Sequence, residues 1–190
     1  MKLVFASNNK NKIQEIKQLL PSGIQLLSLE DIGCYEDIPE TADTIEGNAI
    51  LKADYITRNY GYDCFADDTG LEVTALDGAP GVYSARYAGE QKNADNNMDK
   101  LLNGLQGVTE RHAKFKTVIA LNYKANQHLF TGIAEGEITT EKAGDKGFGY
   151  DPVFKPAGKN LTFAQISMEE KAKLSHRGKS VAQLIAFLQK

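Results

Sequence analysis

The segment that decides the fold is Cys64-Phe65-Ala66-Asp67-Asp68-Thr69-Gly70-Leu71-Glu72-Val73. An apolar run leads into two adjacent aspartates, and Leu71 and Val73 then resume the alternation that is typical of a strand. Neighbouring carboxylates repel each other and lose hydration unless a cation or hydrogen-bond donors compensate them. A hard cation such as Mg²⁺ is suited to this, because it takes oxygen ligands and shares them with substrate phosphates. The alternative is a polar turn, for which Asp-Asp-Thr-Gly is also good chemistry.

The composition is that of an ordinary globular protein. The 190 residues suffice for one domain with a full hydrophobic core, and 42% of them are hydrophobic and 25% charged. A formal net charge of −3 argues against a binder of nucleic-acid polymers, which needs a basic face. Cys34 and Cys64 have no metal-binding spacing, and the apolar run after Met1 is too short for a signal peptide or a membrane span. We therefore expect a soluble cytoplasmic protein that has no membrane partner.

Hydrophobic periodicity predicts that helices and strands are mixed along the chain. Strands are expected over residues 3–6, 63–66, 71–75, 113–123, 128–138 and 150–154, and helices over about 13–20, 43–60, 93–105 and the C-terminal part. Residues 124–127 would join the two long strands as a hairpin. No internal repeat or low-complexity linker is visible, so we expect one domain over residues 1–190. This order predicts an α/β fold with a mixed sheet.

Two segments carry positive charge that is suited to an anion. The loop Ser7-Asn8-Asn9-Lys10-Asn11-Lys12 joins a buried strand to a helix, where free backbone N–H groups and the helix dipole favour a phosphate. An Asn-rich N-cap followed by solvated lysines would explain the same residues. Lys52 falls on the apolar stripe of its helix, so its ammonium either reaches a polar cleft or snorkels to the edge.

A third carboxylate and an aromatic segment add to these candidates. Glu40 lies in the loop Ile38-Pro39-Glu40-Thr41, from which it could join the two aspartates. The segment Gly147-Phe148-Gly149-Tyr150-Asp151-Pro152 offers flexible backbone, two rings and a carboxylate. Glycine lets the backbone approach a ligand closely, and an aromatic ring can stack on a flat base. A plain turn into a strand is the alternative here.

The C-terminal part supplies further hydrogen-bond donors. Ser167 begins a short helix with a capping box, and that helix carries Lys171. His176-Arg177 begins the last helix, either as a donor pair or as a solvated junction. Together, the anion loop, the inward lysine, the carboxylates and the aromatic and donor residues describe a site for a metal-bound nucleoside triphosphate. No Ser-His-Asp order, His cluster or reactive cysteine motif competes with this interpretation.

Six segments of this chain resemble the Ham1 family of inosine and xanthosine triphosphate pyrophosphatases. They are Ser7-x-Asn9-x-x-Lys12, Asn48-Ala49-Ile50-Leu51-Lys52-Ala53, Ala66-Asp67-Asp68-Thr69-Gly70-Leu71, Gly78-Ala79-Pro80-Gly81-Val82-Tyr83-Ser84-Ala85-Arg86-Tyr87, Gly147-Phe148-Gly149-Tyr150-Asp151-Pro152 and Ser175-His176-Arg177-Gly178. The resemblance implies Mg²⁺-dependent hydrolysis of ITP, dITP and XTP to the monophosphate and pyrophosphate, which clears deaminated purines from the nucleotide pool. It also implies a homodimer, and a long twisted mixed sheet flanked by helices, with two lobes around a central substrate cleft.

The resemblance further implies roles for single residues. Those that would hold the phosphates are Ser7, Asn8, Asn9, Lys10, Asn11 and Lys12, with Lys52 reaching the same group. Glu40 and Asp68 would bind Mg²⁺, Asp68 would also be the base that activates water, and Asp67 would support this catalytic set. Thr69 would touch the substrate, and the residues that would enclose the base are Phe148, Gly149, Tyr150, Asp151, Lys171, His176 and Arg177.

Two positions depart mildly from the family pattern. Asn8 stands where the family often has Gly, and Asn tolerates positive φ better than most residues. Thr69 stands where Ser is frequent, and the hydroxyl is kept.

Two other functions compete with this interpretation. A Maf-type nucleotide pyrophosphatase is disfavoured by His176-Arg177 and by the segment from Phe148 to Asp151. A non-catalytic nucleotide-binding module is disfavoured by the carboxylates, because a pure binder gains little from negative charge beside a polyphosphate.

Overall fold

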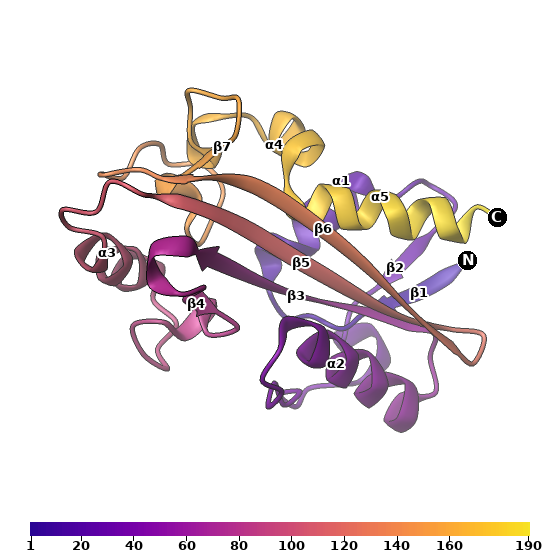
Figure 1. Cartoon of the computed structure of the whole chain (residues 1–190). Helices are drawn as coiled ribbons and strands as arrows, with labels where there is room; N and C mark the ends of the chain where they lie inside the picture. Colours follow the sequence, from indigo (N-terminus) through magenta and orange to yellow (C-terminus); the bar gives the residue numbers. More distant parts are fainter. The chain divides into compact units, whose positions relative to one another are not determined.

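The structure, a computed structural model, describes all 190 residues as one seven-stranded sheet with helices packed on it (Figure 1). The strands are β1 Lys2–Phe5, β2 Gln25–Leu27, β3 Cys64–Val73, β4 Pro80–Gly81, β5 His112–Tyr123, β6 Asn126–Ile138 and β7 Phe154–Pro156. The α-helices are α1 Lys10–Leu19, α2 Ile45–Tyr60, α3 Ala94–Gly104, α4 Met168–Leu174 and α5 His176–Leu188.

The sheet is mixed, as the sequence predicted. Its strand order is β2-β1-β3-β5-β6-β7, with β4 paired to β3. Strand β1 is parallel to both β2 and β3, whereas β4 runs antiparallel to β3 and β7 runs antiparallel to β6. The predicted α/β class, with a mixed sheet flanked by helices, is therefore confirmed.

The contacts within the chain divide it into two units. Unit 1 comprises residues 1–68, 117–132 and 178–190, and unit 2 comprises residues 69–116 and 133–177. Strands β3, β5 and β6 contribute residues to both units, and the boundary within β3 falls between Asp68 and Thr69. The expectations of one domain over residues 1–190 and of a central cleft stay predictions.

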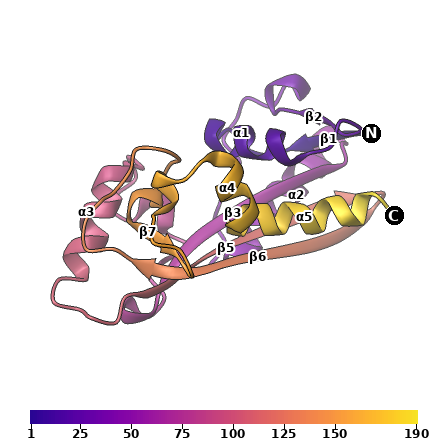
Figure 2. The ribbon, with the colours of Figure 1, turned by 90° about the horizontal axis from the view of Figure 1, so that it is seen from above.

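Unit 1 has helices on both faces of its sheet. Residues 3–5 of β1 and 64–67 of β3 are buried, which is why, Asp67 apart, they appear in the sequence as continuous apolar runs. Alternate residues such as Val4 and Ala66 pack against α2, while their neighbours Phe5 and Phe65 pack against α1 and α5. Figures 1 and 2 show α2 on one face of these strands and α1 with α5 on the other.

Unit 2 is built around aromatic side chains. Leu71 and Val73 at the end of β3 pack with Leu101 of α3 in one buried cluster. The Phe115 ring of β5 lies 4.6 Å from the ring of Phe154 and 6.2 Å from that of Phe163, centre to centre. These three rings lie together in the buried hydrophobic cluster of unit 2.

Three local expectations were wrong. The acidic pair does not separate two strands but lies within β3, so the polar-turn alternative is excluded. Residues 150–154 form a 3₁₀ turn, Asp151–Val153, followed by β7, because Pro152 lacks the backbone donor that a central strand needs. Helix α1 begins at Lys10 instead of near residue 13, because the side chain of Asn9 caps it.

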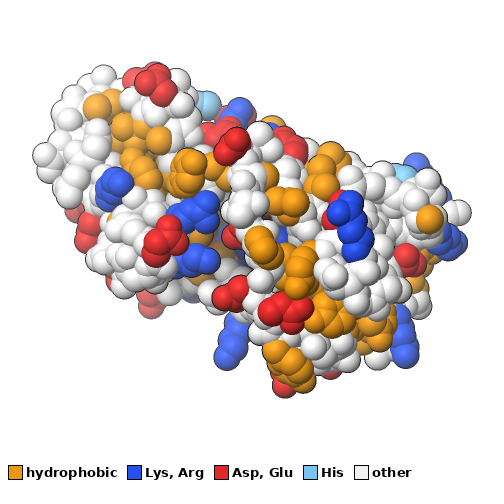
Figure 3. Space-filling model, turned by 90° about the horizontal axis from the view of Figure 1, so that it is seen from below, with side chains coloured by type: hydrophobic (Ala, Val, Ile, Leu, Met, Phe, Trp, Pro, Cys, Tyr) orange, Lys and Arg blue, Asp and Glu red, His pale blue; other side chains and the backbone are white.

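Strand β2 was not predicted from the sequence. Strand β2 has three residues, which is too short for an alternating pattern to show. On the face in Figure 3, acidic and basic side chains lie among one another. No helix of the structure combines the length and the apolar character needed to cross a membrane.

Candidate active site

The two aspartates of β3 point to opposite faces of the sheet. Successive side chains of a strand alternate between faces, so Asp67 shares a face with Phe65, and Asp68 shares one with Ala66. Asp67 therefore faces the α1 side of unit 1, and Asp68 faces the α2 side. Each of these helices supplies a lysine to the aspartate on its side.

The resulting ion pairs join all three predicted carboxylates to two predicted lysines. The Lys12 ammonium lies 3.0 Å from Oδ1 of Asp67, whose side chain is fully buried. The Lys52 ammonium lies 2.5 Å from Oε1 of Glu40 and 3.6 Å from Oδ1 of Asp68. We call Lys12, Glu40, Lys52, Asp67 and Asp68 the carboxylate–lysine cluster.

Helix α2 holds Lys52 inward instead of letting it snorkel. Lys52 is 7% exposed and lies on the same buried stripe as Ala49 and Ala53. The loop that carries Glu40 is tied to this helix, because the side-chain oxygen of Asn48 accepts a hydrogen bond of 2.9 Å from the backbone N–H of Ala42. The inward position and the ion pairs of Lys52 exclude snorkelling to the edge, and its place at a substrate cleft stays a prediction.

Charge and burial oppose each other within the carboxylate–lysine cluster. Burial raises the pKa of the Asp68 carboxyl, and Lys52 and Lys12 only partly offset this. Burial also lowers the pKa of the Lys52 ammonium, but Asp68, Glu40 and Asp67 together raise it above its ordinary value. Lys52 therefore stays charged, and Asp68 takes up a proton more readily than an exposed aspartate does.

The N-terminal loop contains the N-cap that the sequence offered as one of two alternatives, and its role in holding phosphates stays a prediction. The side-chain oxygen of Asn9 accepts hydrogen bonds from the backbone N–H groups of Asn11 and Lys12, at 3.1 and 3.2 Å, and so caps α1. This cap places Lys12 in the first turn, where it reaches Asp67. The side chains of Asn8, Asn9, Lys10 and Asn11 are exposed, and Ser7 is half-buried.

A second cluster of predicted residues lies in unit 2. The Lys171 ammonium lies 2.6 Å from Oδ2 of Asp151 and 4.8 Å from the centre of the Phe148 ring. The Arg177 guanidinium lies 5.6 Å from the same ring centre, and its Nη2 donates to Oγ1 of Thr69 at 3.1 Å. Cations held this close to an aromatic face are attracted by its quadrupole. We call Thr69, Phe148, Asp151, Lys171 and Arg177 the aromatic–cation cluster.

The turn before Asp151 depends on Gly147. The Oδ2 atom of Asp151 accepts a hydrogen bond of 2.9 Å from the backbone N–H of Phe148, so the carboxylate folds back over the turn. A Cβ atom at Gly147 would overlap that oxygen, and Gly147 also has φ of +70°. Gly149 has a similar φ of +61°, but a Cβ there would meet nothing.

Two more predicted residues are fixed inside unit 2. His176 is 3% exposed, and its ring stacks on that of Phe115 at 4.5 Å between centres. Tyr150 is 5% exposed, and its hydroxyl donates to the backbone oxygen of Ser84 at 2.7 Å. The structure thus places Tyr150 as a buried anchor of its loop.

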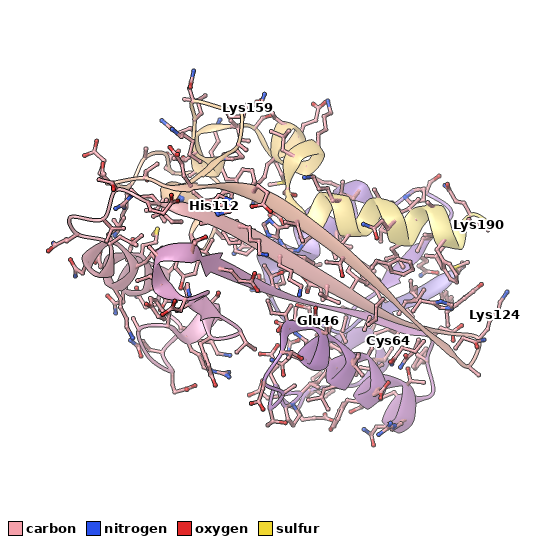
Figure 4. The ribbon with its side chains drawn as sticks, in the orientation of Figure 1. Glu46, Cys64, His112, Lys124, Lys159 and Lys190 are labelled. Carbon is pink, nitrogen blue, oxygen red and sulfur yellow. The ribbon has the colours of Figure 1, made fainter.

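Sequence reasoning assigned no role to Ser84 or Asn97, although both are buried polar residues. The backbone oxygen of Ser84 accepts the hydrogen bond from Tyr150, and the side-chain amide of Asn97 donates to the backbone oxygens of Ser84 and Ala85. Ser84 lies in the segment Gly78–Tyr87, which resembles the family pattern, and this was the one sequence signal that could have pointed to it. Ser84 and Asn97 are both uncharged, so neither breaks the hydrophobic pattern as a buried charge does. The cysteines play no part, because both are buried and burial raises the pKa of each thiol. Figure 4 shows Cys64 on β3 beside α2.

A mixed sheet that carries a carboxylate–lysine cluster and an aromatic–cation cluster is suited to an α/β protein that handles nucleotides. A model of the Ham1 family matches residues 3–187, and the chain belongs to this family. It is 68% identical to the dITP/XTP pyrophosphatase of Flavobacterium johnsoniae over 99% of this chain and 98% of that protein. It is 62% identical to the protein of the same name from Christiangramia forsetii over 100% of both chains.

Solved structures of the family share the fold. The Ham1 protein of Staphylococcus aureus superposes with a TM-score of 0.91 at 42% identity, covering 100% of this chain and 98% of that one. The HAM1 protein of Coxiella burnetii gives a TM-score of 0.92 at 36% identity, with 100% and 98% covered.

We predict that Lys12→Met destabilises the protein by about 3–5 kcal/mol, because it leaves the fully buried carboxylate of Asp67 without this partner. Lys10→Met is the matched control, since Lys10 is exposed and should change stability by less than about 0.5 kcal/mol. Urea unfolding at pH 7 measures both. Equal effects of the two substitutions would contradict the importance of the pair.

We also predict that Gly147→Ala destabilises the protein more than Gly149→Ala. Both carry the cost of positive φ, about 1–2 kcal/mol, but only Gly147→Ala displaces the Asp151 carboxylate. Urea unfolding of the two variants compares them, and thermal melting in parallel checks that both unfold in one transition. The idea fails if the two variants are equally stable.

Proposed function

We propose that this protein hydrolyses ITP, dITP and XTP to the monophosphate and pyrophosphate, and so keeps deaminated purines out of DNA and RNA. The observation that carries the proposal is the inward ammonium of Lys52 beside Glu40 and Asp68. A buried lysine beside carboxylates suits a reaction in which a polyphosphate must be bound and water activated. Membership of the Ham1 family, with relatives named dITP/XTP pyrophosphatase, supports the same substrates.

The carboxylate–lysine cluster would receive the triphosphate. Lys12 and Lys52 supply positive charge, and the exposed N-terminal turn of α1 supplies short polar side chains from Ser7 to Asn11. Asp68 would act as the general base, since its raised pKa makes it a better proton acceptor than an ordinary aspartate. Asp67 would hold Lys12 in place, because the two side chains form an ion pair.

The donor set of this cluster fits Mg²⁺. Two ammoniums face three carboxylates, which leaves one negative charge in excess. No three acidic, His or Cys side chains converge as ready ligands, and Mg²⁺ is usually held by one or two carboxylates plus substrate phosphates. Glu40 and Asp68 would therefore hold it together with the substrate. The ion would neutralise phosphate charge and favour the attack of water.

The aromatic–cation cluster would receive the base. Phe148 offers a ring face, and Lys171 and Arg177 carry donors suited to the carbonyl oxygen at position 6 of hypoxanthine or xanthine. Adenine has an amino group there, and two facing donors would each cost about 1–3 kcal/mol. Xanthine has oxygen where guanine has a 2-amino group of similar size, so rejection of GTP requires donors fixed near position 2.

We further infer that the protein works as a cytoplasmic homodimer. The family resemblance supports the dimer, and two buried cysteines without a disulfide are consistent with a reducing compartment. The small-molecule nucleotide would be its partner, and the net charge of −3 disfavours a nucleic-acid polymer.

Two rivals lead to different assays. A Maf-type pyrophosphatase would prefer other bases, and the charged pair Lys171 and Arg177 around Phe148 disfavours it. A non-catalytic binding module would bind nucleotide without releasing pyrophosphate. The buried carboxylates disfavour it, because they repel phosphate unless they serve a metal or a proton transfer.

We predict that Asp68→Asn lowers kcat for ITP by about 100-fold or more, since it removes a base and a ligand charge while keeping the shape. Asp63→Asn is the control, because Asp63 precedes β3 and its carboxylate accepts a hydrogen bond from the backbone N–H of Lys124. Pyrophosphate release across a Mg²⁺ series measures both variants. Near-normal turnover in folded Asp68→Asn would overturn the assignment.

We predict that kcat/KM for ITP and XTP exceeds that for ATP by about 100- to 10,000-fold, in line with discrimination by polar sites. GTP should also be a poor substrate. Arg177→Ala should reduce this preference more than it changes the Mg²⁺ concentration needed for half-maximal activity. Pyrophosphate release from each nucleotide, with and without Mg²⁺, tests the proposed function. Comparable kcat/KM for ATP and ITP would refute it.

A further inference from the structure

We propose that Ser84 is a positioning residue that sets the selectivity of this site between hypoxanthine and guanine, a role that rests on the function proposed above. Ser84 begins the 3₁₀ turn Ser84–Arg86 and is buried in unit 2. It belongs to neither cluster, but its hydroxyl and its backbone oxygen each hold a different part of the aromatic–cation cluster.

The hydroxyl of Ser84 holds the strand that carries Thr69. Its Oγ accepts a hydrogen bond of 2.8 Å from the backbone N–H of Leu71 and donates one of 2.6 Å to the backbone oxygen of Gly81. Leu71 follows Thr69 by two residues on β3. The position of Thr69 is therefore coupled to the position of Ser84.

The backbone oxygen of Ser84 holds the loop that carries Phe148. It accepts the hydrogen bond from the buried Tyr150 hydroxyl at 2.7 Å, and Tyr150 lies between Phe148 and Asp151. The side-chain amide of Asn97 on α3 supports the same turn by donating to the backbone oxygen of Ala85 at 2.9 Å. The Tyr150 hydroxyl thus fixes the position of the loop, and through it the position of the Phe148 ring against which the base would lie.

These contacts form a closed ring within unit 2. Arg177 donates to Thr69 and lies over the Phe148 ring, so it joins the two parts that Ser84 holds. The ring runs from Ser84 through Leu71 and Thr69 to Arg177, and returns through Phe148 and Tyr150. Loss of the hydrogen bond from Leu71 to the Ser84 hydroxyl, or of the one from Tyr150 to the Ser84 backbone oxygen, leaves the spacing between Thr69 and Phe148 less constrained.

That spacing matters most for the base that the site must reject. Guanine differs from hypoxanthine by an amino group at position 2. If a hydrogen-bond donor of the protein is held opposite that amino group, both donors stay unpaired and the binding of guanine is penalised. If the spacing between Thr69 and Phe148 is less constrained, the amino group can reach water or an acceptor, and the penalty falls. The ring should therefore affect the ratio of ITP to GTP more than it affects the chemical step.

The test compares Tyr150→Phe and Ser84→Ala in the full-length protein by steady-state pyrophosphate release from ITP and GTP. Each should lower the ITP-to-GTP ratio of kcat/KM by about 10-fold, mainly through KM, which is the size expected for one lost hydrogen bond. The double variant should lower the ratio by less than the product of the single effects, because both contacts belong to one ring. If Ser84→Ala fails to fold, Tyr150→Phe alone decides the outcome.

Two controls separate positioning from general loss of stability. Tyr87→Phe removes the hydroxyl of a second tyrosine that packs against the buried cluster of unit 2 and supplies none of the contacts named in the ring, and it should keep the ratio. Thr139→Val removes a hydroxyl of the same unit that donates to the backbone oxygens of Glu141 at 2.7 Å and Val153 at 3.3 Å but to no member of the ring, and it should lower stability without changing the ratio. The proposal fails if folded Tyr150→Phe keeps the ratio, or if Thr139→Val lowers it equally. An unmodified protein that does not cleave ITP would overturn the proposed function, and this proposal with it.

Discussion

The two-residue period of β3 is the constraint on which unit 1 depends. It sends the adjacent carboxylates of Asp67 and Asp68 to opposite faces of a sheet that is covered by helices on both sides. A carboxylate taken out of water needs a compensating partner, so each face must supply a cation. Helix α1 supplies Lys12 on one side, and α2 supplies Lys52 on the other. The inward position of Lys52 meets this requirement on one face, and on the other the Asn9 cap begins α1 at Lys10 and so places Lys12 beside Asp67.

The two clusters both bury charged side chains, but their net charges have opposite sign. The carboxylate–lysine cluster carries three carboxylates and two ammoniums, one negative charge in excess, which suits a divalent cation with its phosphates. The aromatic–cation cluster carries Lys171 and Arg177 against Asp151, one positive charge in excess, which suits carbonyl oxygens on a flat ring. Asp68 of the first cluster and Thr69 of the second are adjacent in the sequence.

Long and strongly patterned elements could be predicted from the sequence, whereas capped or short ones could not. The hairpin of β5 and β6 and the helix α3 were predicted to within about two residues, because their apolar periods extend over several turns or alternations. The start of α1 was missed because a single hydrogen-bonding side chain, Asn9, decides it. The prediction that the acidic pair separates two strands was wrong, because tertiary ion pairs outweigh the turn preference of Asp and Gly.

The sequence by itself determined which residues carry charge into apolar surroundings, since Lys52 and the Asp67-Asp68 pair are visible as breaks in a hydrophobic pattern. Only the tertiary structure decided which cation meets which carboxylate, because Lys12 and Asp67 are 55 positions apart and pair through the packing of α1 on the sheet. Uncharged anchors such as Ser84 also became visible only there. A serine leaves no mark in a hydrophobic pattern, and its role depends on which backbone groups the fold brings within hydrogen-bonding distance.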